Sequence, residues 1–138
     1  MKHLLDTCVF SEYQNKKPNP AVLDWIDAQI EESLYISVLT VGEIQKGIAK
    51  LPKSKKQERL AAWLETSIYR FDKRILPVDL KILRRWGELT GTLEKKGRVL
   101  PIIDSLIAAT ALAHNLIVVT RNEEDFAGAG VTLLNVWK

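Results

Sequence analysis

The chain has 138 residues, which suits one domain that buries about two-thirds of its unfolded surface. Hydrophobic residues make up 46% of it, enough for a real core and too many for a disordered chain. No apolar run approaches the ~20 residues that a membrane-spanning helix needs. We therefore expect a single globular domain over residues 1–138, with no membrane partner.

Two features of the N-terminal segment indicate the compartment. Asp6 interrupts the only early apolar stretch, so no secretory pattern is visible. Cys8 is the only cysteine, and one cysteine permits no intramolecular disulfide. Both features favour the reducing cytoplasm.

The net charge of +3 is unevenly distributed along the chain. Residues 46–98 hold 15 Lys and Arg against 6 Asp and Glu, whereas the remaining residues hold 5 against 11. A basic middle would attract a phosphate polyanion such as RNA. The same charges also fit solvated helix faces, and the sequence leaves both interpretations open.

Apolar strand-like segments alternate with helix-like segments in chain order. Asn19 and Pro20 have the residue types preferred at a helix N-cap and first helical position. Pro77 indicates an edge strand or a strand end. The alternation predicts an α/β fold with a mostly parallel central sheet flanked by helices. Strands are expected at 2–6, 34–37, 75–78, 116–120 and 131–134, and helices at about 20–30, 38–51, 54–72, 79–96 and 104–114.

Four acidic residues come where a strand ends or a helix begins. Asp6 closes the first strand, and Glu43 follows the second by a few residues. Asp104 opens an Ala- and Leu-rich helix, and Asp125 follows the strand at 116–120. The carboxyl ends of parallel strands line one crevice, so these carboxylates are expected to converge. Clustered carboxylates repel one another and imply a hard cation such as Mg²⁺, which predicts metal-assisted phosphoryl chemistry.

Each acidic residue also has a purely structural interpretation. Asp6 and Asp104 suit helix N-caps. Thr40-Val41-Gly42-Glu43 matches the capping box S/T-x-x-E. Ser37 is an earlier candidate cap, and a helix beginning there would leave Glu43 free to face the crevice.

Polar residues near the acidic ones are candidates for substrate contacts. Lys46 lies one helical turn beyond Glu43, and Arg121 follows the strand at 116–120. Both could bind phosphates. Thr120 and Asn122 could add oxygen ligands or substrate contacts in the same loop.

Taken in order, these motifs resemble the PIN-domain ribonucleases, most closely the VapC type of bacterial and archaeal toxins. The resemblance covers nearly the whole chain. Cys8 replaces the asparagine usual in that family, and Ser105 replaces the usual alanine. The motifs are Leu4-Leu5-Asp6-Thr7, residues 36–44 continued by Lys46-Gly47-Ile48, residues 104–111, and Val119-Thr120-Arg121-Asn122 with Asp125-Phe126.

The resemblance implies a PIN-like fold and a metal-dependent endoribonuclease that cleaves RNA phosphodiester bonds. It assigns Mg²⁺ or Mn²⁺ to Asp6, Glu43, Asp104 and Asp125 as the catalytic and metal-binding quartet. It also implies the toxin component of a toxin–antitoxin pair that inhibits growth or translation. A cognate VapB-type antitoxin and a homodimer are the expected protein partners.

Two other functions remain open from the sequence. A phosphoacceptor receiver domain also clusters aspartates around Mg²⁺, although it normally has an acidic pair after the first strand, where Asp6 stands alone. A non-catalytic RNA-binding or interaction module would use the acidic residues only as caps. Such a module would bind RNA with no dependence on divalent metal.

Overall fold

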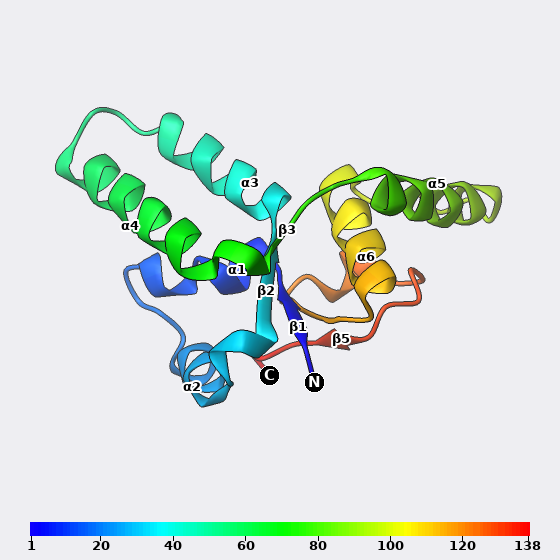
Figure 1. The fold of residues 1–138 in the computed structure, drawn as a ribbon, viewed down its shortest axis with the longest axis horizontal. Helices are drawn as coiled ribbons and strands as arrows, with labels where there is room; N and C mark the ends of the chain where they lie inside the picture. Colours follow the sequence, from blue (N-terminus) through cyan, green and yellow to red (C-terminus); the bar gives the residue numbers. More distant parts are fainter.

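A five-stranded parallel sheet forms the centre of the computed structural model, which describes residues 1–138 (Figure 1). The strand order is β3-β2-β1-β4-β5, and every neighbouring pair is parallel. The predicted α/β class is confirmed. A receiver domain has the strand order 2-1-3-4-5, so the topology excludes that alternative. The strands are β1 (His3–Leu5), β2 (Leu34–Ser37), β3 (Ile75–Leu76), β4 (Ile117–Val119) and β5 (Leu133–Leu134).

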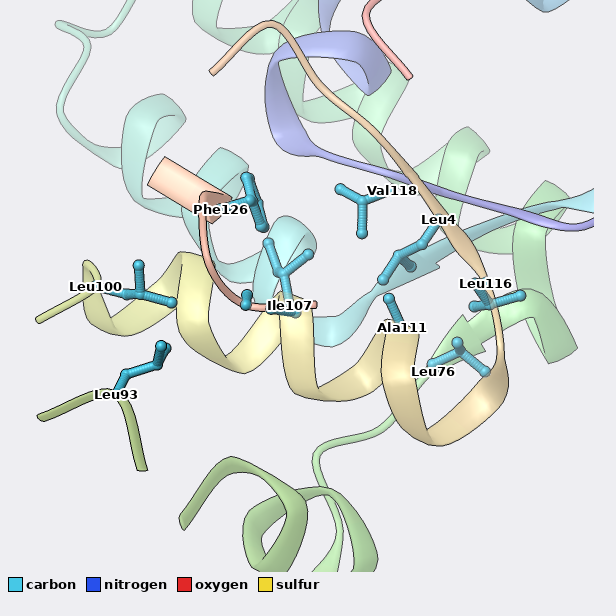
Figure 2. Close-up of a cluster of buried hydrophobic side chains, with 11 residues drawn as sticks. Leu4, Leu76, Leu93, Leu100, Ile107, Ala111, Leu116, Val118 and Phe126 are labelled. Atoms are coloured by element: carbon cyan, nitrogen blue, oxygen red, sulfur yellow. The ribbon is translucent and has the colours of Figure 1, made fainter. Parts of the chain in front are cut away.

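The sheet is buried on both faces. Leu4 and Val118 belong to one hydrophobic cluster, whereas Leu5 and Val119 belong to a second one. Successive residues of a strand point to opposite faces, so each strand contributes to both clusters. This two-sided burial explains why the strands read as continuous apolar runs. Figure 2 shows Leu4 and Val118 facing the helix at 102–114.

Helices cover the two faces in separate groups (Figure 1). The cluster that contains Leu5 is completed by α1 (Thr7–Phe10), α2 (Pro20–Ala28), α3 (Val38–Ala49) and α4 (Lys55–Phe71). The cluster that contains Leu4 is completed by α5 (Leu80–Lys95), α6 (Ile102–His114) and the 3₁₀ helix η4 (Glu123–Phe126). The hairpin α3–α4 and the pair α5–α6 therefore lie on opposite sides of the sheet. The remaining 3₁₀ helices are η1 (Glu12–Gln14), η2 (Glu31–Ser33) and η3 (Asp72–Arg74).

Side-chain caps begin most of the longer helices. Asn19 accepts a 2.9 Å hydrogen bond from the Ala21 backbone, and Pro20 is the first residue of α2, as predicted. Ser54 and Asp79 cap α4 and α5 in the same way. Each cap satisfies a backbone N–H that the helix itself leaves unbonded. Pro77 directly follows β3, which lies at the sheet edge, also as predicted.

Helix α6 begins earlier than the sequence predicted. It starts at Ile102 rather than Asp104, and Pro101 occupies the N-cap without any side-chain hydrogen bond. The alternative interpretation of Asp104 as an N-cap is therefore wrong, because Asp104 is the third residue of the helix. A short apolar run such as Ile102-Ile103 fits a strand or a helix equally well. No helix of the chain combines the length and the apolarity needed to cross a bilayer.

Candidate active site at the carboxyl end of the sheet

Asp6 is the most enclosed of the four acidic residues. It leaves β1 as the N-cap of α1, and one carboxylate oxygen accepts a 2.9 Å hydrogen bond from the Thr7 backbone. The other oxygen accepts a 2.8 Å hydrogen bond from the Thr120 hydroxyl. Only 4% of Asp6 is exposed. Burial raises its pKa, the two hydrogen bonds oppose that rise, and the charges of Glu43 and Asp125 add to it. Asp6 thus caps a helix and also belongs to the acidic group.

Glu43 lies within α3, so the capping box at Thr40 is not formed. Ser37 caps this helix by accepting a 3.0 Å hydrogen bond from the Leu39 backbone. Thr40 lies inside the helix and is fully buried. Glu43 is therefore free of the cap, and its carboxylate accepts a 2.6 Å hydrogen bond from the Thr7 hydroxyl. This contact draws Glu43 toward the end of β1.

Asp104 is half-buried in the first turn of α6, and its pKa departs further from the ordinary value than that of any other acidic residue. Its pKa is raised to about 7. Burial is the main cause, and the charges of Asp6, Asp125 and Glu43 contribute in that order. No hydrogen bond compensates its charge. A nearby cation would stabilise the charged form of such a half-buried carboxyl group.

Asp125 lies in η4, which follows β4. The neighbouring Phe126 is buried in the cluster on the α6 side of the sheet, and Figure 2 shows its ring close to Ile107. Arg98 donates a 2.9 Å hydrogen bond to the backbone oxygen of Glu124. These two anchors hold η4 in place, so Asp125 is fixed mainly through its backbone.

The four carboxylates form one electrostatic group although they come from distant parts of the chain. The charges of the other three residues raise the pKa of Asp104, and the charges of Glu43 and Asp125 raise the pKa of Asp6. No three His, Cys, Asp or Glu side chains lie close enough together to hold a metal ion as they stand. The donor set consists only of hard oxygen atoms. This chemistry fits a hard divalent cation, whose charge would offset the repulsion.

The predicted substrate-contacting residues divide into two groups. Lys46, Arg121 and Asn122 are exposed, and Arg121 lies over the Trp137 ring with 4.9 Å to its centroid. Lys46 and Glu43 line one groove of about 490 Å³ together with apolar residues of α3 and with Val78 and Ile103. Thr120 has no exposed surface. It donates a hydrogen bond to Asp6 and does not line the groove.

Two polar residues near the site were not assigned a role from the sequence. Thr7 orients Glu43 through its hydroxyl and Asp6 through its backbone N–H. Its position directly after Asp6 was the only available signal. Cys8 has its sulfur 3.9 Å from an Asp6 carboxylate oxygen, and burial raises its thiol pKa. From the sequence, Cys8 is expected to be a small buried residue rather than a nucleophile because no basic partner adjoins it; the structure leaves it half-buried, and a raised thiol pKa disfavours the nucleophilic thiolate.

Comparison with known proteins identifies the family. The sequence profile of the PIN domain matches residues 3–131. A VapC ribonuclease of Sinorhizobium fredii is 39% identical over 136 residues, which cover 98% of this chain and 97% of that protein. Toxin FitB of Neisseria gonorrhoeae is 38% identical over 135 residues, which cover 97% of both chains.

Solved structures agree with the sequence comparison. In the crystal structure of FitAcB from Neisseria gonorrhoeae, a chain with 38% identity superposes with a TM-score of 0.92 over 97% of both chains. In VapBC2 from Rickettsia felis bound to a DNA fragment from their promoter, a chain with 28% identity superposes with a TM-score of 0.80 over 98% of both chains. The chain therefore belongs to the PIN-domain family and, within it, to the VapC ribonucleases.

Proposed function

We propose that this protein is a divalent-metal-dependent endoribonuclease and the toxin of a toxin–antitoxin pair. One observation carries the catalytic part of the proposal. Four carboxylates from four separate segments converge at the carboxyl end of the sheet, where the charges of their neighbours raise the pKa of Asp6 and of Asp104, in a chain whose full-length relative is a ribonuclease. Metal-assisted phosphodiester hydrolysis uses such a group of oxygen ligands, since the cation that they hold offsets charge on the phosphate.

Asp6 and Asp104 would hold Mg²⁺ or Mn²⁺ directly, with Glu43 and Asp125 completing the site. When bound, the ion supplies Lewis acidity toward a phosphate oxygen and toward water. The chain itself supplies the orientation of the ligands. Thr120 and the Thr7 backbone fix the two oxygens of Asp6, and the Thr7 hydroxyl fixes Glu43.

The surface around the carboxylates supports an RNA substrate. Lys46 shares a groove with Glu43 and presents an exposed ammonium group to a phosphate. Arg121 and Asn122 are exposed in the loop that follows β4. We assign these three residues to phosphate and sugar contacts, which position an RNA backbone without reading its sequence.

Protein partners follow from the family. The relative from Neisseria gonorrhoeae is named a toxin, and the two related crystal structures are of the assemblies FitAcB and VapBC2. We infer a VapB-type antitoxin for this chain, acting on a homodimeric toxin in the cytoplasm. Growth inhibition would result from RNA cleavage when the antitoxin is absent.

The proposal is tested with purified protein and a fluorescent single-stranded RNA. We expect endonucleolytic cleavage in Mg²⁺ or Mn²⁺, complete loss of cleavage in excess chelator, and recovery when metal is restored. Asp104→Asn prepared in parallel controls for contaminating nuclease. Undiminished cleavage in chelator would overturn the metal mechanism. RNA binding that is indifferent to metal, without any cleavage, would favour the non-catalytic RNA-binding module.

A further inference from the structure

Asp104 differs from its neighbours in how it is held. Asp6 and Glu43 each accept hydrogen bonds from threonine groups, whereas no hydrogen bond holds the Asp104 carboxylate. Its position therefore depends on the first turn of α6. That turn lacks a side-chain cap, because Pro101 occupies the N-cap position. An uncapped turn frays more easily than a capped one.

One pair of side chains ties this turn to the neighbouring helix. The indole N–H of Trp86 in α5 donates a 2.8 Å hydrogen bond to the Ser105 hydroxyl. That hydroxyl in turn donates a 2.6 Å hydrogen bond to the backbone oxygen of Ile102. Ser105 is 1% exposed and directly follows Asp104. No other side-chain hydrogen bond joins α5 to α6.

Apolar side chains do not completely fill the contact between α5 and the start of α6. A cavity of about 80 Å³ lies between α5 and the start of α6, and both Trp86 and Ser105 line it. Ile102, the first residue of the helix, is 69% exposed and so contributes little burial. Leu93 and Leu100 are buried and line the same cavity, and Figure 2 places them near the end of α6 where the helix begins. The hydrogen-bonded relay Trp86–Ser105–Ile102 thus joins the two helices beside this cavity.

The first turn of α6 is also subject to repulsion between like charges. Asp104 is repelled by Asp6, Asp125 and Glu43 when no cation is present. Repulsion pushes the carboxylate, and the uncapped turn that carries it, away from the site. A relay that links the turn to α5 opposes this displacement. It also satisfies the hydroxyl of the buried Ser105 and the indole N–H of the half-buried Trp86, and a buried polar group is costly to leave unpaired.

We propose that Trp86 and Ser105 are positioning residues that hold the first turn of α6 so that Asp104 stays within reach of the cation shared with Asp6. The inference rests on the proposed metal-dependent function and deepens it. Ser105 stands where the family motif has alanine, so the relay is a feature of this chain's own sequence. Neither residue touches the substrate or the metal.

The test compares Ser105→Ala, Trp86→Phe and the double variant with the wild type. Mn²⁺ affinity is measured by titration calorimetry, below the unfolding temperature of every variant. We expect each single variant to bind Mn²⁺ about tenfold more weakly, the lower end of the effect of residues that orient metal ligands. The double variant should lose no more than either single one, because the two side chains act as one unit.

Thr110→Val is the matched control. Thr110 is fully buried in α6, and its hydroxyl donates a 2.8 Å hydrogen bond to the Leu106 backbone oxygen, away from the first turn. This variant should lose stability but keep wild-type Mn²⁺ affinity. In cleavage assays, the relay variants should lose kcat at limiting Mn²⁺ and recover it at saturating Mn²⁺, with KM for RNA unchanged. A purely structural role would not produce this metal rescue.

Two results separate failure of the inference from failure of the proposed function. If the wild type binds Mn²⁺ and Asp104→Asn does not, while the relay variants bind as tightly as the wild type, the positioning role is wrong. Equal losses of affinity in the relay variants and in Thr110→Val would overturn it as well. If the wild type itself binds no Mn²⁺, the metal-dependent function is wrong and the inference is overturned with it.

Discussion

The hydroxyl of Thr120 donates a 2.8 Å hydrogen bond to Oδ2 of Asp6, joining residues 114 positions apart in the chain. The bond links the ends of the adjacent parallel strands β1 and β4. The same hydroxyl oxygen accepts a hydrogen bond from the Asn122 backbone. Thr120 thus fixes a buried carboxylate and also the first residues of the loop that carries Asp125. The contact therefore links two strand ends at the candidate active site.

Replacing Thr120 with valine should therefore affect both stability and activity. The change keeps the shape of the side chain but removes the donor to a charged acceptor, which costs about 1.5–3 kcal/mol of unfolding free energy. We expect cleavage to fall roughly 10- to 100-fold, as for other residues that orient metal ligands. Urea unfolding and the cleavage rate provide the two measurements. Thr110→Val is the control, and equal activity in the two variants would contradict the role assigned to Thr120.

Asp104→Asn should abolish cleavage and growth inhibition without unfolding the protein. The amide keeps the size of the side chain and removes the charge that would hold the cation. In metal-free buffer at neutral pH the variant should be more stable than the wild type, since it relieves the repulsion from Asp6, Asp125 and Glu43. Thermal unfolding by circular dichroism and a toxicity assay provide the measurements. Full activity in the purified variant would remove Asp104 from the site.

The stability of the metal-free protein should depend on pH in a direction set by Asp104. Its pKa is about 7 in the folded state against 3.8 as the ordinary value, so the folded state binds more protons between these values. The contribution of the protonated Asp104 to the free energy of unfolding is therefore complete below about pH 4 and is lost as pH rises toward 7. Asp6, whose pKa is also raised, acts in the same direction.

The measurement is the unfolding temperature in chelator across that pH range. The difference between the wild type and Asp104→Asn isolates the contribution of Asp104 from those of the other groups. We expect the variant to show a flatter pH profile. Added Mg²⁺ or Mn²⁺ should restore wild-type stability near neutral pH, because the cation binds only the folded state. Parallel pH profiles for the two proteins would show that Asp104 does not carry the effect.

The basic segment, residues 46–98, should determine RNA affinity, whereas the four acidic residues should determine the turnover rate. Lys53, Lys55 and Lys56 are exposed at the tip of the α3–α4 hairpin, and none takes part in an ion pair. Replacing all three with glutamine should raise KM and lower the salt slope of binding by about 0.7 for each phosphate that the variant no longer neutralises. Glu43→Gln should lower kcat and leave binding unchanged.

The control is Lys16→Gln with Lys17→Gln, which removes two positive charges, one fewer than the three-lysine variant, at exposed lysines outside the basic segment. RNA binding measured by fluorescence anisotropy at several salt concentrations distinguishes the sets. If the three-lysine variant and the control bind RNA with the same salt slope, the basic tip is a solvated surface. The nuclease assignment would survive that outcome.

Local signals in the sequence were sufficient for much of the fold. Apolar runs alternating with amphipathic segments predicted the parallel sheet, and Asn19-Pro20 predicted the start of α2, as the structure confirms. The four acidic residues could be chosen because the carboxyl ends of parallel strands meet at one edge, whatever the side-chain details. Strand ends, caps and their order are properties of short segments, so they can be predicted from the sequence alone.

The contacts that orient the site depend on tertiary structure. Thr120 has no surface in the folded chain, and nothing in its sequence neighbourhood identifies Asp6 as its acceptor. The choice between Thr40 and Ser37 as the cap of α3 was settled by the burial of Thr40 against the rest of the protein.

The Trp86–Ser105 contact likewise exists only because α5 packs across α6. Each of these interactions joins residues whose separation in sequence has no fixed relation to their distance in space. Sequence pattern therefore determined which residues form the acidic group, and packing of helices on the two faces of the sheet decided how those residues are held.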